Sequence, residues 1–219
     1  NWFRPVNFVN APDGTLYAID LAREILEAVH IPFDVANVLD LTRGRDRGRI
    51  FRIEPNGFKP RPAPRLSQTS SEELVQLLGH PNAWHRETAH RLLFERQDRS
   101  VIPSLRSILA DSARVSEESA LRRLHALWSL HGLASLTDDD LIQALITPHP
   151  ALRENALRIA RAQSPLSQSA LNAVISLAKD NNPRVRLHAA FTLGAQDARA
   201  ATISLADLAR DEIAMGTWL

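Results

Sequence analysis

The 219-residue chain contains no cysteine, and this absence removes several kinds of site at once. Without thiols the chain can hold no disulfide framework, no thiolate zinc site, no cysteine nucleophile and no covalently attached c-type haem. Charge of one sign is also lacking, because the formal net charge is only +1. This near-zero balance removes the usual reason to expect a nucleic-acid or anionic-membrane binder.

Lysine is almost absent, since only Lys59 and Lys179 occur among 26 basic residues. So strong a preference for arginine is typical of a GC-rich coding bias rather than of many separate guanidinium functions. No apolar run approaches the roughly 20 residues that a membrane-spanning helix needs. The chain starts at Asn1 with neither an initiator methionine nor a signal peptide, so we expect a segment of a larger protein.

The character of the sequence changes near residue 60, where four prolines fall within residues 55–65. Such a stretch favours extended polyproline geometry and a semi-rigid spacer. We therefore predict a β-type region over residues 1–54, a linker over 55–65 and a helical region over 66–219.

In the β-type region, the apolar runs 6–9 and 16–19 flank a turn that contains Pro12-Asp13-Gly14, which predicts a β-hairpin. Residues 21–29 predict a short helix, and residues 50–53 predict a third strand. Three short strands cannot bury two sheet faces alone, so this region is a fragment of a larger sheet or rests against the helical part.

The helical region repeats internally, because an arginine followed three residues later by an alanine recurs at intervals of 30 to 37 residues. The four aligned arginines are Arg86, Arg123, Arg153 and Arg186. A helix and a turn precede most of these motifs, and Ser70 and Thr137 fit helix starts. A period of this length with two helices per unit is typical of an α-solenoid. We predict a mainly α fold of about four helical hairpins with a small N-terminal β-element.

Residues 182–190, Asn-Pro-Arg-Val-Arg-Leu-His-Ala-Ala, resemble short bacterial HEAT repeats, and the likeness extends over about residues 70–219. Residues 1–20 and 31–53 resemble the final blade of a six-bladed, sugar-dehydrogenase-type β-propeller. A propeller end followed directly by HEAT repeats is similar to the planctomycete-type membrane-bound dehydrogenase family.

That resemblance implies a periplasmic or otherwise exported parent protein with an oxidoreductase role. Members of the family carry a propeller related to quinoprotein glucose and sorbosone dehydrogenases, then HEAT repeats, and often a C-terminal haem domain. A PQQ-like quinone and a c-type haem are therefore implied for the parent. This chain has no Cys-x-x-Cys-His motif and at most one blade, so neither cofactor site is complete within it.

Two groups of polar residues in the β-type region are candidate sites. In related propellers, polar residues at strand ends line the channel that holds quinone and substrate, which points to cofactor contacts from Arg4, Asn7, Asp20 and Arg23. The alternative is a set of hydrogen bonds within the blade and a turn cap, and it is the favoured interpretation.

The second group is the loop that carries Arg43, Arg45, Arg47 and Arg49, whose glycines free backbone amides that could grip a phosphate or carboxylate. The favoured alternative is an exposed loop whose arginines pair with neighbouring acids.

In the helical region, the histidines at 80, 85 and 90 are five residues apart and do not share a helix face, so we expect no metal site. The aromatic residues Phe94, Trp128 and Phe191 are predicted to fill the core. Trp84 is expected in the turn before its helix and exposed, which with His85 makes a candidate partner-binding position.

We expect the segment itself to be non-catalytic, an interaction scaffold within a larger exported oxidoreductase that binds a protein partner or neighbouring domains of its own chain. A first alternative is that the β-type region joins the active site of a quinone-dependent sugar or alcohol dehydrogenase. A weaker alternative is a free-standing HEAT module that binds protein or nucleic acid, and the neutral charge argues against nucleic acid.

Overall fold

The computed structural model describes residues 2–25, 31–59, 62, 64–111 and 116–210. The chain divides into two compact units, Asn1–Arg65 with Asn82–Trp84 and Leu66–Pro81 with His85–Leu219. The sequence of residues 215–218 also predicts a turn before a further helix, and these residues lie outside the described ones.

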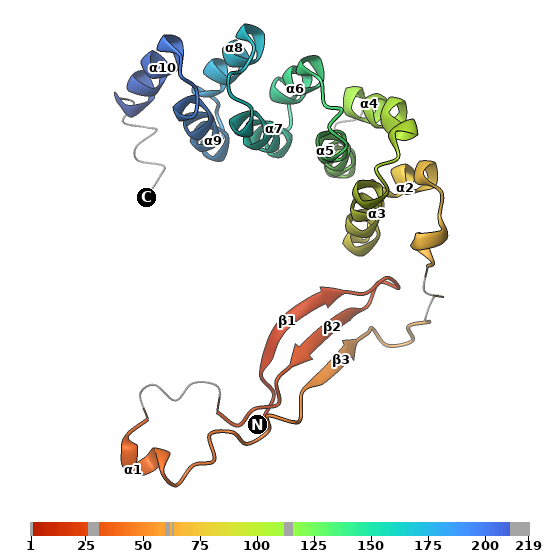
Figure 1. Cartoon of the computed structure of the whole chain (residues 1–219). Helices are drawn as coiled ribbons and strands as arrows, with labels where there is room; N and C mark the ends of the chain where they lie inside the picture. The colour runs from red at the N-terminus through yellow and green to blue at the C-terminus, as the bar shows by residue number, and fades with distance from the viewer. Residues whose placement is uncertain (1, 26–30, 60–61, 63, 112–115, 211–219) are drawn as a thin grey trace. The chain divides into compact units, whose positions relative to one another are not determined.

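The first unit contains a three-stranded antiparallel sheet in the order β1-β2-β3 (Figure 1). Its strands are β1 (Pro5–Asn10), β2 (Leu16–Asp20) and β3 (Arg49–Ile53). The predicted hairpin and third strand are confirmed. Gly14 in the connecting turn has a φ of +94°, a conformation that glycine adopts without steric cost.

The helix predicted over residues 21–29 is wrong for its described part, because residues 21–25 are not helical. Ala22 takes a left-handed φ of +51°, and its amide donates to the carboxylate of Asp20 at 3.1 Å. This local bond replaces the first helical turn. The described helix of this unit is instead α1 (Phe33–Ala36), and the rest of the predicted span lies outside the described residues.

The second unit is a succession of helical hairpins, as predicted, so the fold is mainly α with a small β-element. The helices are α2 (Ser71–Leu77), α3 (Ala83–Arg96), α4 (Ile102–Ala110), α5 (Glu117–Gly132), α6 (Asp138–Leu145), α7 (Pro150–Ala162), α8 (Gln168–Leu177), α9 (Pro183–Gly194) and α10 (Arg199–Arg210).

Side-chain caps fix several helix starts. Ser70 and Thr137 each form a capping box, accepting from the amide of Glu73 or Asp140 while that residue's carboxylate bonds the cap amide. Both predicted starts are confirmed. Pro150 and Pro183 open α7 and α9, where a missing amide donor costs no helical hydrogen bond.

The helices of the second unit form two rows (Figure 1). Helices α3, α5, α7 and α9 make an inner row along the hollow side of an arc, and α2, α4, α6, α8 and α10 make an outer row. The small repeat alanines Ala89, Ala126, Ala156 and Ala189 are all fully buried. A small residue at this place lets the helices pack closely, and buried leucines fill the space between the rows.

The repeat arginine bonds the turn that precedes its own helix in three of the four repeats. Arg86 Nη1 donates to the carbonyls of His80 and Pro81 at 2.6 and 2.8 Å. Arg153 does the same to residues 147 and 148 at 2.8 and 2.7 Å, and Arg186 to residues 180 and 181 at 2.9 and 3.4 Å. One guanidinium thus satisfies two carbonyls that no helix can bond.

Two of the four repeat arginines, Arg153 and Arg123, join one repeat to the next. Arg153 forms an ion pair with Asp180 at 2.8 Å, and both side chains are nearly buried, at 14% and 8% exposure. In the preceding repeat Arg123 donates to the hydroxyl of Thr147 at 3.1 Å. Thr147 and Asp180 hold equivalent positions, six residues before the following repeat arginine. The solenoid therefore has a repeated polar link between neighbouring hairpins.

We predict that Asp180→Ala lowers the free energy of unfolding by about 3 kcal/mol, because it leaves the Arg153 guanidinium buried without its counter-charge. Chemical denaturation followed by helical circular dichroism measures this loss. The matched control is Glu95→Ala, which breaks the exposed Arg91–Glu95 pair on α3 and is expected to cost less than about 0.5 kcal/mol. Equal losses in both variants would contradict a role for the buried link.

Candidate functional site

The four candidate cofactor residues of the β-element are engaged in local hydrogen bonds. The buried carboxylate of Asp20 accepts from the amide of Arg4 at 2.5 Å and from Nε of Arg49 at 2.9 Å. The Arg4 side chain donates to the carbonyls of Phe3 and Glu24 at 3.1 and 3.2 Å. These contacts tie the chain entering β1 to the ends of β2 and β3.

The other two candidates make separate contacts. Arg23 donates to the carbonyl of Leu41 at 2.6 Å, and the side chain of Asn7 accepts from the amide of Phe8 at 2.8 Å. Burial raises the pKa of Asp20, but bonds from the amides of Arg4 and Ala22 and from Arg49 outweigh it and hold that pKa below its usual value. Asp20 is therefore ionised and holds the amides of Arg4 and Ala22 and the side chain of Arg49. A cofactor role for the four candidate residues stays a prediction.

Three of the four candidate anion-binding arginines contact side chains from other parts of the first unit. Arg43 pairs with Glu24 at 3.2 Å and lies over the Trp2 ring at 5.0 Å. Arg47 lies over the same ring at 5.8 Å, and Arg49 is the partner of Asp20. Arg45 is exposed. Pairing with neighbouring acids therefore accounts for two of these arginines, and anion binding by the loop stays a prediction.

Gly44 fixes the path of this loop. Its φ is +87°, and an added Cβ would lie 2.2 Å from the carbonyl oxygen of Ala22. The close approach requires glycine, so the arginines are held on a defined turn.

The sheet leaves many apolar side chains open to solvent. Phe8 and Phe51 lie on one face beside the buried Ala18, and Ile50 lies on the other face with 71% of its surface exposed. Phe8 is 56% exposed and Phe51 38%. Within the described residues of this unit the sheet lacks a second layer that covers these faces.

In the second unit, the side of the inner-row helices that faces away from the outer row carries a repeated set of exposed or half-buried positions. We call this surface the inner face and define it by the residues two and five places after each repeat alanine. These residues are Arg91, Phe94, Trp128, His131, Arg158, Arg161, Phe191 and Gly194. Three arginines, three large aromatic side chains and one histidine therefore lie along the hollow side of the solenoid.

Several aromatic residues differ from their predicted environment. Phe94 and Phe191 were expected in the core but are 54% and 46% exposed, because they lie on the inner face rather than against the outer row. Trp128 is half-buried, with Nε1 donating to Asn155 at 3.1 Å. Trp84 lies within α3 rather than before it and is half-buried, so the expectation of an exposed turn residue is wrong.

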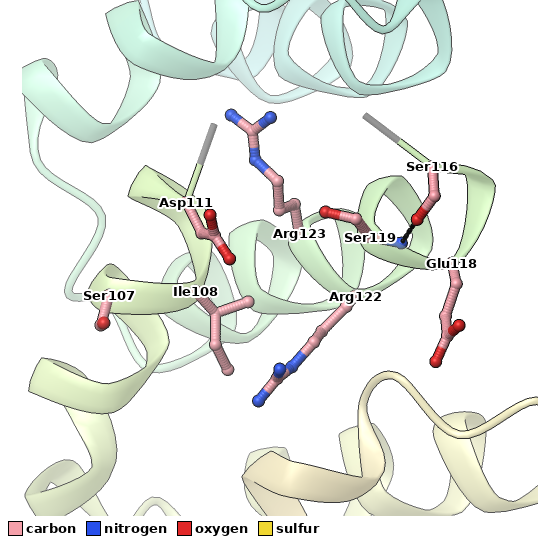
Figure 2. A pocket seen from close by; sticks show the side chains of 8 residues that line it. All are labelled: Ser107, Ile108, Asp111, Ser116, Glu118, Ser119, Arg122 and Arg123. Carbon is pink, nitrogen blue, oxygen red and sulfur yellow. Dashed lines mark hydrogen bonds between the residues drawn. The ribbon is translucent and has the colours of Figure 1, made fainter. Parts of the chain in front are cut away.

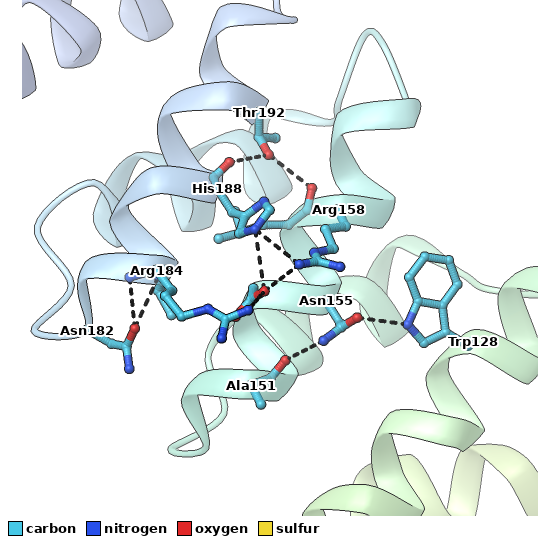
Figure 3. A network of polar contacts seen from close by, with 11 residues as sticks. Trp128, Ala151, Asn155, Arg158, Asn182, Arg184, His188 and Thr192 are labelled. Atoms are coloured by element: carbon cyan, nitrogen blue, oxygen red, sulfur yellow. Dashed lines mark hydrogen bonds and ion pairs between the residues drawn. The ribbon is translucent and has the colours of Figure 1, made fainter. Parts of the chain in front are cut away.

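A polar cluster lies between α7 and α9, the last two helices of the inner row (Figure 3). The buried carboxylate of Glu154 accepts from Arg158 at 2.6 Å and from Arg184 at 3.1 Å, and lies 3.4 Å from Nε2 of His188. Burial, and the nearby charge of Arg158, hold the pKa of His188 below its usual value. Next to the cluster, Arg161 lies over the Phe191 ring at 5.2 Å.

Histidines pair in two other places. The rings of His80 and His85 lie 4.1 Å apart, and both side chains are half-buried. Nδ1 of His90 lies 3.2 Å from Nδ1 of His125 on the neighbouring inner helix. Burial lowers the pKa of His125 to about 4, with the charges of His90 and Arg86 acting in the same direction. A neutral pair at neutral pH follows, since one ring must accept what the other donates.

A polar cavity of about 290 Å³ lies beside the start of α5 (Figure 2). Ser116 caps the helix through the amide of Ser119, while Arg122 and Arg123 extend in different directions from the same helix. Arg122 donates to Gln76 at 2.9 Å, and Arg123 to the carbonyl of Leu109 at 2.9 Å. These arginines hold neighbouring helices together.

Among the described residues there is no group of three or more histidine, aspartate or glutamate side chains placed to hold a metal ion. In the same part of the chain, no helix is both long and apolar enough to cross a membrane.

Glu154 and the arginines around it were not predicted from the sequence, because the net charge of the whole chain is only +1. Counted by helix, α7 and α9 contain five arginines and a single acidic residue, Glu154. This local excess of arginine over acidic residues is the sequence signal that could have predicted the cluster.

Two protein-family models match separate parts of the chain. A family model described as a domain of unknown function, DUF7133, matches residues 1–57. The model for HEAT repeats matches residues 139–214, so this part of the chain carries HEAT repeats. No curated protein matches the chain.

Among solved structures, a designed armadillo repeat protein in complex with the peptide (KR)4 is similar to this chain. It is 15% identical, with a TM-score of 0.36, and the match covers 64% of this chain and 70% of that one. At this identity and TM-score the similarity carries no argument about binding by this chain.

The pKa of His125 predicts a pH dependence of stability. A histidine in the unfolded chain has a pKa of about 6.5. Between pH 6.5 and about pH 4, the unfolded chain therefore binds more protons at this residue than the folded chain does. The free energy of unfolding should therefore fall as the pH is lowered through this window. An NMR titration of the His125 imidazole should give a midpoint near 4. A midpoint at the ordinary value would contradict the buried neutral pair.

Proposed function

We propose that the helical region is a protein-binding scaffold and that its inner face is the binding surface. The exposure of Phe94 and Phe191 is the observation that carries the proposal. Large aromatic side chains and arginines are enriched at the centres of protein interfaces. Here they recur at equivalent positions of successive repeats, so one partner could contact several hairpins at once. The HEAT-repeat match supports this function.

A second candidate concerns the parent protein. We propose that the β-element belongs to a larger β-structure in an exported, quinone-dependent sugar or alcohol dehydrogenase. The uncovered apolar faces of the sheet favour this, because a three-stranded sheet with Phe8 and Ile50 open to solvent needs a further layer. In such a protein the repeats would seat a partner or a neighbouring domain, and the quinone would accept electrons from the substrate.

The first proposal predicts that a photoreactive phenylalanine analogue in place of Phe191 forms a cross-link to a partner in the source cells. The same analogue in place of Ile203, which is 53% exposed on α10 of the outer row, is the matched control. Once the cross-linked partner is identified and purified, Phe191→Ala should weaken its binding by about 2 kcal/mol, or roughly thirtyfold, in a titration.

In the same titration Ile203→Ala should leave the affinity within about twofold, and both variants should keep the helical circular dichroism of the wild type. Cross-linking at both positions alike, or unchanged affinity in Phe191→Ala, would argue against the inner face as the binding surface.

The second proposal predicts that the purified full-length protein, loaded with a quinone cofactor, reduces an artificial electron-acceptor dye when given a sugar or alcohol. Cell fractionation should place the protein outside the cytoplasm. A lack of dye reduction across aldoses, sugar acids and alcohols would leave the scaffold function alone.

A further inference from the structure

The helices of the second unit separate charge between the two rows. The inner-row helices contain ten arginines and five acidic residues, whereas the outer-row helices contain three arginines and six acidic residues. The net charge of +1 for the whole chain hides this separation. The excess of positive charge is concentrated on α7 and α9, and three of the five arginines on these helices lie at or beside the polar cluster described above (Figure 3).

Glu154 holds two of these arginines in place without removing their charge. Its buried carboxylate bonds Arg158 and Arg184, whose side chains are still 45% and 71% exposed. A guanidinium has five N–H donors, so each retains donor capacity beyond the bond to Glu154. Arg161 lies one helical turn after Arg158 on α7, so it adds a third positive group near this single negative group. We call Arg158, Arg161 and Arg184 the arginine cluster.

An apolar contact lies directly beside the arginine cluster. The guanidinium of Arg161 lies over the ring of Phe191, which is itself 46% exposed. Stacking leaves the edge of a guanidinium, where its donors lie, directed away from the ring. An incoming carboxylate could therefore bond Arg161 while an apolar side chain of the same ligand packs against Phe191.

We propose that the arginine cluster binds an acidic segment of a partner protein. Carboxylates of the segment accept hydrogen bonds from Arg158, Arg161 and Arg184, and a flanking apolar or aromatic residue packs on Phe191. This rests on the proposed scaffold function and specifies the chemistry of the partner. The cluster is short, and the inner-row helices α3 and α5 carry four glutamates, so the basic surface does not continue as a track for nucleic acid.

Binding of three peptides of equal length to the full chain tests this proposal. The first contains alternating glutamate and leucine with one phenylalanine, the second replaces each glutamate by glutamine, and the third replaces each by lysine. We expect the acidic peptide to bind at least tenfold more tightly than the glutamine peptide, because a carboxylate adds Coulombic attraction to each guanidinium that a neutral amide lacks. Its affinity should also fall as salt is raised from 50 to 300 mM.

Single variants locate the binding. Arg161→Gln and Arg184→Gln should each weaken the acidic peptide by roughly five- to tenfold, with the thermal unfolding midpoint within about 2 °C of the wild type. Arg199→Gln removes the same charge from an exposed position of α10 and should leave the affinity within twofold. Equal binding of the acidic and glutamine peptides, or unchanged affinity in both cluster variants, would overturn the proposal.

The remaining outcomes separate this inference from the scaffold function. If the acidic peptide does not bind but the cross-linked partner binds in a Phe191-dependent way, the scaffold function stands and the acidic ligand is wrong. If neither binds, both proposals fail. Tighter binding of a 20-nucleotide single strand, lost in Arg184→Gln, would overturn the proposal in favour of nucleic acid. Concentration-dependent self-association lost in the same variant would assign the cluster to a second copy of this chain.

Discussion

The solenoid depends on the arginine that begins each Arg-x-x-Ala motif. In three repeats its guanidinium bonds two carbonyls of the turn before the inner helix, and these acceptors have no helical partner. A nearly buried cation is costly unless its donors are satisfied, and the turn supplies the acceptors. The arginine therefore needs the turn carbonyls as acceptors, and the turn carbonyls need the arginine as their donor. Arg123 departs from the rule, since it bonds the carbonyl of Leu109 at the end of α4 instead.

The same residue explains how the repeats stay in register. Arg153 reaches Asp180 of the next turn, and Arg123 reaches the equivalent Thr147. Leucine and alanine packing between helices is nearly non-directional and would tolerate a small slide of one hairpin on the next. A bond from a fixed arginine to a fixed turn residue would not, so the polar link defines the position that the apolar core stabilises.

Much of the fold follows from local sequence signals, whereas the surface does not. The Arg-x-x-Ala spacing and the caps at Ser70 and Thr137 predict the hairpins, because each acts within one or two turns of helix. Exposure of Phe191 could not be predicted in this way, since an inner helix has one face toward the outer row and another toward the hollow side. Both faces recur at helical spacing, so a single-helix pattern cannot tell them apart. The helix prediction was wrong at residues 21–25 for a related reason, because Asp20 bonds the Ala22 amide in a contact that helix propensity does not represent.

The buried carboxylate of Glu154 connects this architecture to binding. Long arginine side chains lose rotamer entropy when they bind a ligand, and that loss reduces affinity. Arg158 and Arg184 are already restrained by Glu154, so part of that cost is met on folding rather than on binding. Because three arginines lie near the single carboxylate of Glu154, the restraint leaves net positive charge facing the hollow side. An inner helix needs only one of its faces for the core, and this leaves the other face able to carry such a cluster without weakening the repeat.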